Sequence, residues 1–325
     1  MCGIFGGVGI SKSEAAKGID LINRGNDGIS ISQLEENLIF AARRHLVKKS
    51  GIDSTETSDQ PYFSEDKKIA LIFNGEFYNF EKYKRKLLDE GKKFISTGDT
   101  EVLLKLYEKT GIDFLLDRNI DSLFSIAIFD KQKNKIFISR DWPGRIPLYY
   151  FYDSNRFIFS SELKAFRSIK NLSLQDPIEL KPGTYVEYDL TNKKLSHVEY
   201  FKPNNSLINK SDEILSIGKN IHNLLDDSSK NRTMGDVPIC TMLSGGIDSV
   251  LTTFYVFKNL DFKKIGYQPT SYVFSVKGFN SPDVKKARIA RDSFKKSIDL
   301  KLVEVEATKQ EIVNDVPNII ESFEM

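Results

Sequence analysis

The chain has 325 residues, of which 40% are hydrophobic and 28% are charged, and its formal net charge at pH 7 is +2. The near-neutral charge argues against a partner that is a nucleic acid or an anionic membrane, and the hydrophobic fraction excludes a disordered chain. At roughly 100–200 residues per domain, the length predicts two domains, each able to bury a core.

Short β-rich segments separated by turn residues fill the first two-thirds of the chain. The expected strands are Cys2–Val8, Leu38–Ala42, Ile69–Asn74, Ser122–Asp130, Lys135–Arg140, Leu148–Tyr152, Arg156–Ser160 and Thr184–Asp189. Two helices interrupt them, one capped by Ser11 with Glu14 at capping-box spacing, the other beginning near Asp99. Many strands with few helices predict stacked sheets rather than a parallel βαβ array.

The pattern changes after residue 200, where the polar segment Lys202–Ser206 indicates a domain boundary. Beyond it, strands and helices alternate. The expected strands are Val237–Leu243, Ser271–Val276 and Leu300–Val305, with helices over 214–225, after Asp248, near Pro282–Phe294 and at the end. This βαβαβα order predicts a parallel sheet. The expected domains are 1–202 and 212–325, joined by a linker at 203–211.

The cysteines and the N-terminus indicate the compartment. Cys2 and Cys240 are too few for a disulfide framework and lack the CxxC spacing of a zinc site. The N-terminus lacks the basic region and apolar stretch of a secretory signal, and every apolar run is far shorter than a membrane span. We therefore expect a globular protein of the cytoplasm.

Cys2 directly follows Met1, and its small side chain is of the kind that permits removal of the initiator. Removal would place a thiol and an α-amine on one residue. The reference pKa of an α-amine is about 7.7–8.0, so near neutral pH a fraction is free base and can take the thiol proton. The three histidines show no pattern typical of a Cys–His dyad. Taken alone, Cys2 is more typical of an incidental small residue at a processed terminus.

Cys2 is accompanied by further short blocks that agree in order, spacing and identity with those of a known family. They are Cys2–Gly6, Arg24–Gly28, Phe73–Asn79, Thr97–Glu101, and Arg140–Asp141 with Gly144 and Pro147–Tyr149. The blocks span nearly the whole first domain and resemble the class II glutamine amidotransferases, which are N-terminal nucleophile (Ntn) hydrolases. The resemblance implies an αββα sandwich of two stacked antiparallel sheets between helices.

The resemblance implies a catalytic group built around the thiol. Cys2 would attack the side-chain amide of glutamine, giving a thioester and ammonia. Asn74, through its side-chain amide, and Gly75, through its backbone N–H, would form the oxyanion hole. Without the resemblance, Asn74-Gly75 is more typical of a hairpin turn.

The same resemblance implies a glutamine-binding group. Glu76 and Asp99 would hold the α-ammonium of glutamine, and Arg44 would pair with its α-carboxylate in a bidentate fork. Taken alone, Arg44 is more typical of a solvated strand residue and Asp99 of a helix N-cap. The family usually has His-Arg-Gly-Pro-Asp where this chain has Asn23–Asp27, so the loop near the thiol is expected to differ.

A second motif follows the strand expected at Val237–Leu243. Ser244-Gly245-Gly246-Ile247-Asp248-Ser249 joins that strand to a helix, an arrangement that can bind an anion through backbone N–H groups and the positive helix end. The motif lacks the Walker A lysine and resembles the SGG-x-DS loop of the N-type ATP pyrophosphatases, the PP-loop. The resemblance implies phosphate contacts from Ser244, Gly245, Gly246 and Ser249, Mg²⁺ binding by Asp248, and adenine contacts from Leu243 and Val276. The alternative is a Gly-Gly turn capped by Asp248, and Cys240 is expected in the core.

The two domains in this order resemble glutamine-dependent asparagine synthetases, ligases of asparagine biosynthesis. The resemblance implies ATP and Mg²⁺ as cofactors and glutamine and aspartate as substrates, with ammonia from the first domain displacing AMP from adenylated aspartate. The chain ends at Met325 within an expected helix and lacks counterparts of the family's second aspartate-bearing block and adenylation lysine. We therefore expect an incomplete ATP pyrophosphatase (adenine nucleotide alpha hydrolase-like) domain, and a chain that can be a glutaminase but is a poor synthetase alone.

Two alternatives stay open. An enzyme with the same domains could amidate another carboxylate, or the chain could be a non-catalytic module that senses glutamine or docks on a partner. A homodimer, or a partner that supplies the missing synthetase half, would cover an exposed apolar face on the second domain. No nucleic-acid or membrane partner is expected.

Overall fold

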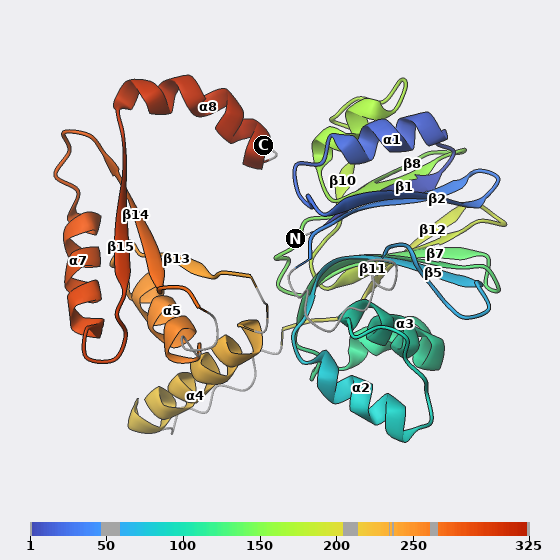
Figure 1. Cartoon of the computed structure of the whole chain (residues 1–325). Coiled ribbons are helices and arrows are strands. Elements are labelled where there is room, and N and C mark those ends of the chain that lie inside the picture. Colours follow the sequence, from blue (N-terminus) through green and yellow to red (C-terminus); the bar gives the residue numbers. More distant parts are fainter. Residues whose placement is uncertain are drawn as a thin grey trace. The chain divides into compact units, whose positions relative to one another are not determined.

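The computed structural model describes residues 2–46, 59–203, 214–233, 235, 237–260 and 266–323. The chain divides into two compact units, the first reaching residue 204 and the second beginning at residue 205 (Figure 1). The expected linker at 203–211 lies, apart from residue 203, outside the described residues.

The first unit contains two six-stranded sheets. The strands of one are β1 (Gly3–Val8), β2 (Gly28–Glu35), β3 (Leu38–Arg44), β8 (Tyr149–Tyr152), β9 (Phe157–Ser160) and β10 (Ile178–Glu179). Those of the other are β4 (Tyr62–Phe63), β5 (Ile69–Phe77), β6 (Ser122–Asp130), β7 (Lys135–Arg140), β11 (Thr184–Asp189) and β12 (Lys194–Glu199). The orders are β10-β8-β9-β1-β3-β2 and β12-β11-β7-β6-β5-β4, with antiparallel pairing throughout.

Helices cover the outer faces of these sheets. They are α1 (Lys12–Asp20), α2 (Phe80–Asp89) and α3 (Asp99–Thr110), with 3-10 turns at Gly111–Leu116 and Leu163–Ser168. Figure 1 shows α1 outside the sheet of β1, and α2 and α3 outside the sheet of β5. The predicted αββα sandwich is therefore confirmed, as is the capping box of Ser11 and Glu14 at the start of α1.

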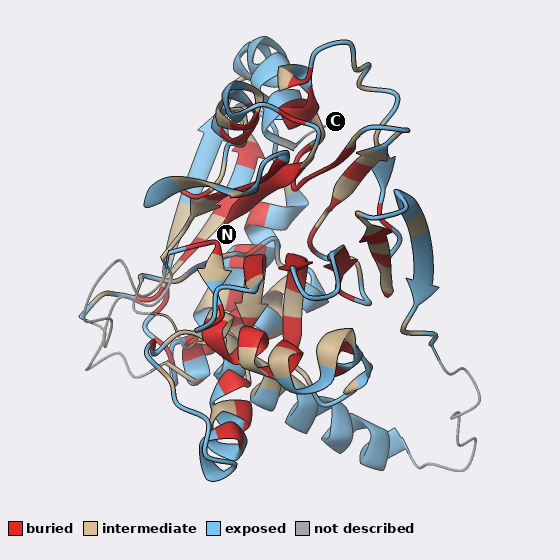
Figure 2. Cartoon of the chain, turned by 90° about the vertical axis from the view of Figure 1, so that its right-hand side faces the viewer, coloured by how far each residue is buried: buried red, intermediate tan, exposed pale blue. Residues whose placement is uncertain are grey.

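The two sheets pack against each other through alternate residues of their strands. Ile4 of β1, Phe40 of β3 and Ile72 of β5 share one buried cluster, and each is 0% exposed. Figure 2 shows buried residues concentrated on the strands. Because side chains alternate between the faces of a strand, residues an even number of positions from these point into the same space. At one end of the sandwich those positions are polar, and they hold the predicted site.

The second unit is a three-stranded parallel sheet with helices. Its strands, in sheet order, are β13 (Cys240–Met242), β14 (Thr270–Val276) and β15 (Lys301–Ala307). Its helices are α4 (Ile214–Arg232), α5 (Ile247–Lys258), α7 (Pro282–Phe294) and α8 (Lys309–Phe323). The predicted alternating order and parallel sheet are confirmed. No helix of the described residues combines the length and apolar character needed to cross a membrane.

Several elements differ from the predictions. α2 was not predicted, because only Phe80, Tyr83 and Leu87 of this charge-rich segment are buried. β2, at the edge of its sheet, was also missed, although Ile29 and Ile31 alternate there with serines. The strand expected at Val237–Leu243 is reduced to β13, and Cys240 is exposed, so its expected core position is wrong.

Candidate functional site

Cys2 directly precedes β1, at the polar end of the space between the sheets. The residue is 9% exposed, and its Sγ atom accepts a hydrogen bond from the backbone N–H of His45 at 3.3 Å. Burial raises the pKa of the Cys2 thiol, and the negative charges of Glu76 and Asp99 act in the same direction. The His45 bond and the positive α-amino group of the chain oppose the shift. The thiol therefore needs a base before it can act as a nucleophile near neutral pH.

Asn74 and Gly75 lie inside β5, opposite Ser125 and Phe124 of β6, so the alternative of a hairpin turn is wrong. Asn74 is 0% exposed, and its Nδ2 atom donates to Oγ of Ser161 at 3.2 Å. A Cβ atom on Gly75 would lie 2.0 Å from the carbonyl oxygen of Leu123. Glycine is thus required at this position by the close approach of β6.

Glu76 and Asp99 form a pair of partly buried carboxylates. Burial and the charge of Asp99 raise the pKa of Glu76 to about 8, and burial raises the pKa of Asp99. The backbone N–H of Phe77 donates to Oδ2 of Asp99 at 2.9 Å, which fixes that carboxylate. Asp99 is the first residue of α3 and Gly98 is its N-cap, so the N-cap alternative is wrong. Two carboxylates that repel each other when ionised suit a cationic ligand.

Arg44 is the last residue of β3 and pairs with a carboxylate of the chain itself. It forms an ion pair with Asp59, and its Nη2 atom donates to the carbonyl oxygen of Asp27 at 3.5 Å. The Arg44 side chain is 11% exposed, so the alternative of a solvated strand residue is wrong. The carboxylate of Asp59 is thus bound to the arginine that was predicted to bind the α-carboxylate of glutamine.

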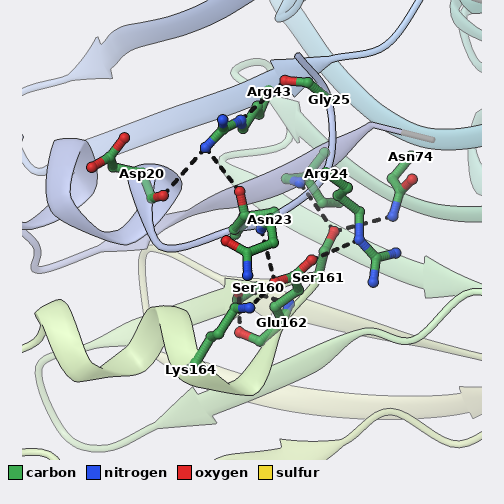
Figure 3. Close-up of polar contacts among 12 residues, drawn as sticks. Asp20, Asn23, Arg24, Gly25, Arg43, Asn74, Ser160, Ser161, Glu162 and Lys164 are labelled. Atoms are coloured by element: carbon green, nitrogen blue, oxygen red, sulfur yellow. Dashed lines mark hydrogen bonds and ion pairs between the residues drawn. The ribbon is translucent and has the colours of Figure 1, made fainter. Parts of the chain in front are cut away.

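The loop after α1, where the sequence departs from the family pattern, is held by contacts of other residues. Nε of Arg24 lies 2.7 Å from Oε1 of Glu162, and the backbone N–H of Asn23 donates to Oε2 of Glu162 at 3.2 Å (Figure 3). Arg43 donates through Nε to the carbonyl oxygen of Gly25 at 3.0 Å. The loop is therefore ordered without the histidine and proline usual in the family.

The structure brings most of the predicted first-unit residues together. Four of them lie an even number of positions from the core residues Ile4, Phe40 and Ile72, so their side chains point into the space between the sheets, at one end of the sandwich. They are Cys2, Arg44, Asn74 and Glu76. Asp99 joins them from the start of α3. Sequence reasoning missed Ser161, Glu162 and Asp59, which bind these residues or the loop beside them. A Ser-Ser-Glu run after a strand offers no motif by which this role could be found.

The residues of the predicted phosphate loop, Ser244–Ser249, form the exposed turn after β13 and the first turn of α5. Gly245 has φ +78°, and a Cβ atom there would lie 2.3 Å from Cβ of Lys286 on α7. The hydroxyls of Ser244 and Ser249 lie 3.1 Å apart, and Ser249 donates to the carbonyl oxygen of Gly246 at 2.9 Å. The N-cap of α5 is Gly246, so the interpretation of Asp248 as a cap is wrong.

The residues predicted to border adenine lie at the same edge of the parallel sheet. Leu243 follows β13, and its backbone N–H donates to the carbonyl oxygen of Tyr272 in β14 at 2.8 Å. Val276 ends β14, so both stand at the carboxyl ends of neighbouring strands, where open α/β sheets bind ligands. Asp248 lies in the first turn of α5. The described residues contain no group of three or more His, Cys, Asp or Glu side chains that could hold a metal.

Two family profiles match the chain. The profile described as "Glutamine amidotransferase domain" matches residues 1–215, and the one described as "Asparagine synthase" matches residues 220–325.

Curated relatives agree with these matches. A Methanocaldococcus jannaschii protein named as a glutamine-hydrolyzing asparagine synthetase is 31% identical, over 82% of this chain and 60% of the relative. Asparagine synthetase B of Escherichia coli is 30% identical, over 89% of this chain and 51% of the relative. Asparagine synthetase 1 of Arabidopsis thaliana is also 30% identical, over 89% and 48%. The chain thus spans about half the length of the curated relatives it matches.

Solved structures share the fold at low sequence identity. Glutamine phosphoribosylpyrophosphate amidotransferase from B. subtilis has a TM-score of 0.50 and 14% identity, covering 89% of this chain and 79% of its own. A structure titled as the allosteric regulatory enzyme of purine biosynthesis has a TM-score of 0.50 and 16% identity, covering 93% and 80%. The predicted fold class, an Ntn hydrolase sandwich followed by a parallel α/β unit, is confirmed.

Proposed function

We propose that this chain, which belongs to the glutamine amidotransferase domain family, hydrolyses the side-chain amide of glutamine at Cys2. The observation that carries the proposal is the gathering of a buried thiol, a buried carboxamide and two partly buried carboxylates at one end of the inter-sheet space. Amide hydrolysis through a thioester needs a nucleophile, an oxyanion donor and groups that orient the substrate.

The proposed chemistry begins after removal of Met1, when the α-amine of Cys2 takes the proton of its own thiol. The sulfur bonds to the amide carbon of glutamine, and the carbonyl oxygen becomes an oxyanion. Nδ2 of Asn74 and the backbone N–H of Gly75 would donate to this oxyanion. Collapse of the intermediate breaks the carbon–nitrogen bond, and the α-ammonium supplies the proton with which ammonia leaves. Water then hydrolyses the thioester to glutamate and regenerates the thiol.

Three charged groups would position the glutamine. The carboxylates of Glu76 and Asp99 would bind its α-ammonium. The charge of Asp99 contributes to the raised pKa of Glu76, and a cation bound between the two carboxylates would relieve their mutual repulsion. Arg44 would bind its α-carboxylate, which would replace the carboxylate of Asp59. Binding of glutamine would thus exchange an internal ion pair for one with the substrate.

We also propose that the second unit binds ATP with Mg²⁺ in a synthetase reaction that uses this ammonia. Bound ATP would supply activation of a carboxylate toward ammonia. The backbone N–H groups of the PP-loop would hold phosphate, together with the hydroxyls of Ser244 and Ser249. Asp248 would contribute one carboxylate to Mg²⁺, which commonly binds one or two carboxylates together with phosphate oxygens and waters.

The acceptor of the ammonia is proposed to be aspartate, because the relatives named above are asparagine synthetases. The proposal extends to a cytoplasmic location, and to a homodimer or a partner that supplies further parts of the synthetase half. The exposed apolar residues of α4, among them Ile214 and Leu224 at 86% and 70% exposure, support an additional covering surface.

Ammonia release from glutamine tests the proposed hydrolysis. The purified chain, with removal of Met1 verified by mass spectrometry, should release ammonia, and Cys2→Ala should abolish the release. Cys240→Ala makes the same chemical change at the exposed cysteine and should leave the rate unchanged. Equal release by Cys2→Ala and the unaltered chain would refute the assignment of the nucleophile.

A further inference from the structure

We infer that Ser161 is a positioning residue for glutamine hydrolysis, whose hydroxyl holds the side-chain amide of Asn74 and the strand of Cys2 in one arrangement. The inference rests on the proposed function, since it gives Ser161 a part in that same reaction. Ser161 follows β9 directly, and it is 0% exposed. It would touch neither the glutamine nor the thiol, so it is not a catalytic residue.

The hydroxyl of Ser161 joins the two sheets. Its Oγ atom accepts a hydrogen bond from Nδ2 of Asn74 at 3.2 Å and another from the backbone N–H of Ile4 at 3.0 Å, and Figure 3 shows the first of these. A serine oxygen has two acceptor positions, and these donors use both. Ile4 lies on β1, two residues after Cys2, and Asn74 lies on β5 in the other sheet. One oxygen atom therefore links the nucleophile strand to the proposed oxyanion donor.

This link matters because the rest of the contact between the sheets is largely apolar packing. The cluster that contains Ile4 and Ile72 fixes the distance between the sheets but has little directional preference. A displacement of about 1 Å in a catalytic group can lower the rate by about 100-fold. Hydrogen bonds are directional, so Ser161 can set the position of Asn74 relative to Cys2 more narrowly than packing can.

The bond to Ser161 also determines how the amide of Asn74 is presented. A carboxamide is planar and has two N–H groups on one nitrogen. When one N–H is bound to Ser161, the direction of the second is determined and stays available for an oxyanion. The Oδ1 atom of Asn74 is buried and has no hydrogen-bond partner among the described residues, so Ser161 is the anchor that this side chain has there.

Ser161 is itself firmly held. Its backbone N–H donates to the carbonyl oxygen of Ile4 at 2.9 Å, which doubles the connection to β1. The next residue, Glu162, is 2% exposed and pairs with Arg24 at 2.7 Å and with Lys164 at 3.3 Å. The hydroxyl thus extends from a segment that is fixed on both sides.

The test compares Ser161→Ala with Ser160→Ala in the full chain. Ser160 is also 0% exposed, but its hydroxyl donates to the carbonyl oxygen of Glu162 and has no bond to Asn74. We expect Ser161→Ala to lower kcat for ammonia release by about 10-fold or more, toward the 10²–10³-fold loss typical of a deleted oxyanion donor, with KM for glutamine little changed. Ser160→Ala should keep kcat. Ser161→Cys, which retains a weak acceptor, should give an intermediate kcat and guards against a folding defect in Ser161→Ala.

A double-mutant cycle separates positioning from mere stability. In an Asn74→Ala background, Ser161→Ala should lower kcat by a much smaller factor, because one of the two groups that it positions is gone. An unchanged kcat in Ser161→Ala, or an equal fold-loss in both backgrounds, would overturn the inference.

A measurement that needs no enzymatic activity tests the role of Ser161 separately from the proposed function. In ¹⁵N-labelled protein, the side-chain amide resonances of Asn74, assigned with Asn74→Asp, should shift and exchange faster in Ser161→Ala than in Ser160→Ala. If the unaltered chain releases no ammonia, the proposed function fails and these resonances decide whether Ser161 holds Asn74. If the chemical shifts and exchange rates of the Asn74 amide are unchanged in Ser161→Ala, the inference is overturned whatever the activity.

Discussion

The backbone N–H of His45 donates a hydrogen bond to Sγ of Cys2 at 3.3 Å, while the ring Nδ1 of the same histidine lies 3.2 Å from Oδ2 of Asp27. The thiol is therefore contacted by the backbone of His45, and the imidazole is engaged with a carboxylate. This arrangement favours a base other than His45 for the thiol. The α-amine of a processed Cys2 is the group that the N-terminal position provides.

The raised pKa of the Cys2 thiol predicts slow alkylation near neutral pH. In the chain that retains Met1, iodoacetamide should modify Cys2 more slowly than the exposed Cys240 at pH 7. The Cys2 rate should keep rising past the ordinary thiol pKa of 9.0, because burial disfavours the thiolate. Peptide mapping by mass spectrometry follows both cysteines in one sample. Faster modification of Cys2 than of Cys240 at pH 7 would contradict the prediction.

Glu76→Gln should weaken glutamine binding, because it removes a negative charge that would face the α-ammonium. We expect KM for glutamine to rise about 10-fold or more. Since the pKa of Glu76 is about 8, its carboxylate ionises as the pH rises, so KM of the unaltered chain should fall between about pH 6.5 and 8.5. Glu76→Gln should lose this fall.

Glu81→Gln on α2 is the matched control, because it makes the same change on the exposed face of a helix. It should keep both KM and its pH dependence. A KM that does not depend on pH in the unaltered chain would argue against Glu76 as the titrating group.

The same pKa shift predicts how the stability of the free protein depends on pH. The folded state binds the Glu76 proton more tightly than the unfolded state, whose pKa is near the ordinary 4.5. The stabilisation is therefore complete below pH 4.5 and is lost as the pH rises through about 8. Urea unfolding at several pH values should show the unaltered chain losing stability relative to Glu76→Gln over this range. A difference that is constant with pH would contradict the shift.

The predictions from sequence succeeded where a local pattern carries the information. Alternating apolar residues indicated β6 and β7, and their positions agree with the structure. The order of the amidotransferase blocks indicated the sandwich. Because side chains alternate along a strand, Cys2, Asn74 and Glu76 then point into the same space between the sheets. Both the alternation of apolar residues and the order of the motifs can be read directly from one amino-acid sequence.

The parts that escaped prediction depend on long-range contacts. Ser161 and Asn74 are 87 positions apart, and their bond exists because two sheets pack face to face. The pairing of Arg44 with Asp59 likewise joins separate segments and has no periodic signal. The burial of α4 likewise depends on contacts beyond its own segment, and none of its residues is buried in the described structure.

Gly75→Ala should destabilise the first unit, because the added methyl would lie 2.0 Å from the carbonyl oxygen of Leu123. Strands β5 and β6 would have to separate, at a cost of about 1–3 kcal/mol. Gly98→Ala is the control, since a Cβ there has its nearest contact 3.9 Å away. The urea midpoint should fall for Gly75→Ala and change little for Gly98→Ala. Equal urea midpoints for the two variants would show that β6 can move to accommodate the methyl group without a loss of stability.

Gly245, in the loop before α5, and Gly278, in the turn after β14, form a matched pair that separates backbone strain from steric fit. Gly245 and Gly278 have φ values of +78° and +80°, so alanine is strained at both. A Cβ on Gly245 would also lie 2.3 Å from Cβ of Lys286 and 2.7 Å from the backbone nitrogen of Ala287, whereas Gly278 has nothing within 4 Å. Gly245→Ala must therefore displace the loop from α7, while Gly278→Ala leaves it in place. If the loop holds phosphate, calorimetry should show ATP binding weakened about 10-fold or more by Gly245→Ala alone. Similar losses in both variants would attribute the effect to strain and remove the support that this loop gives to an ATP site.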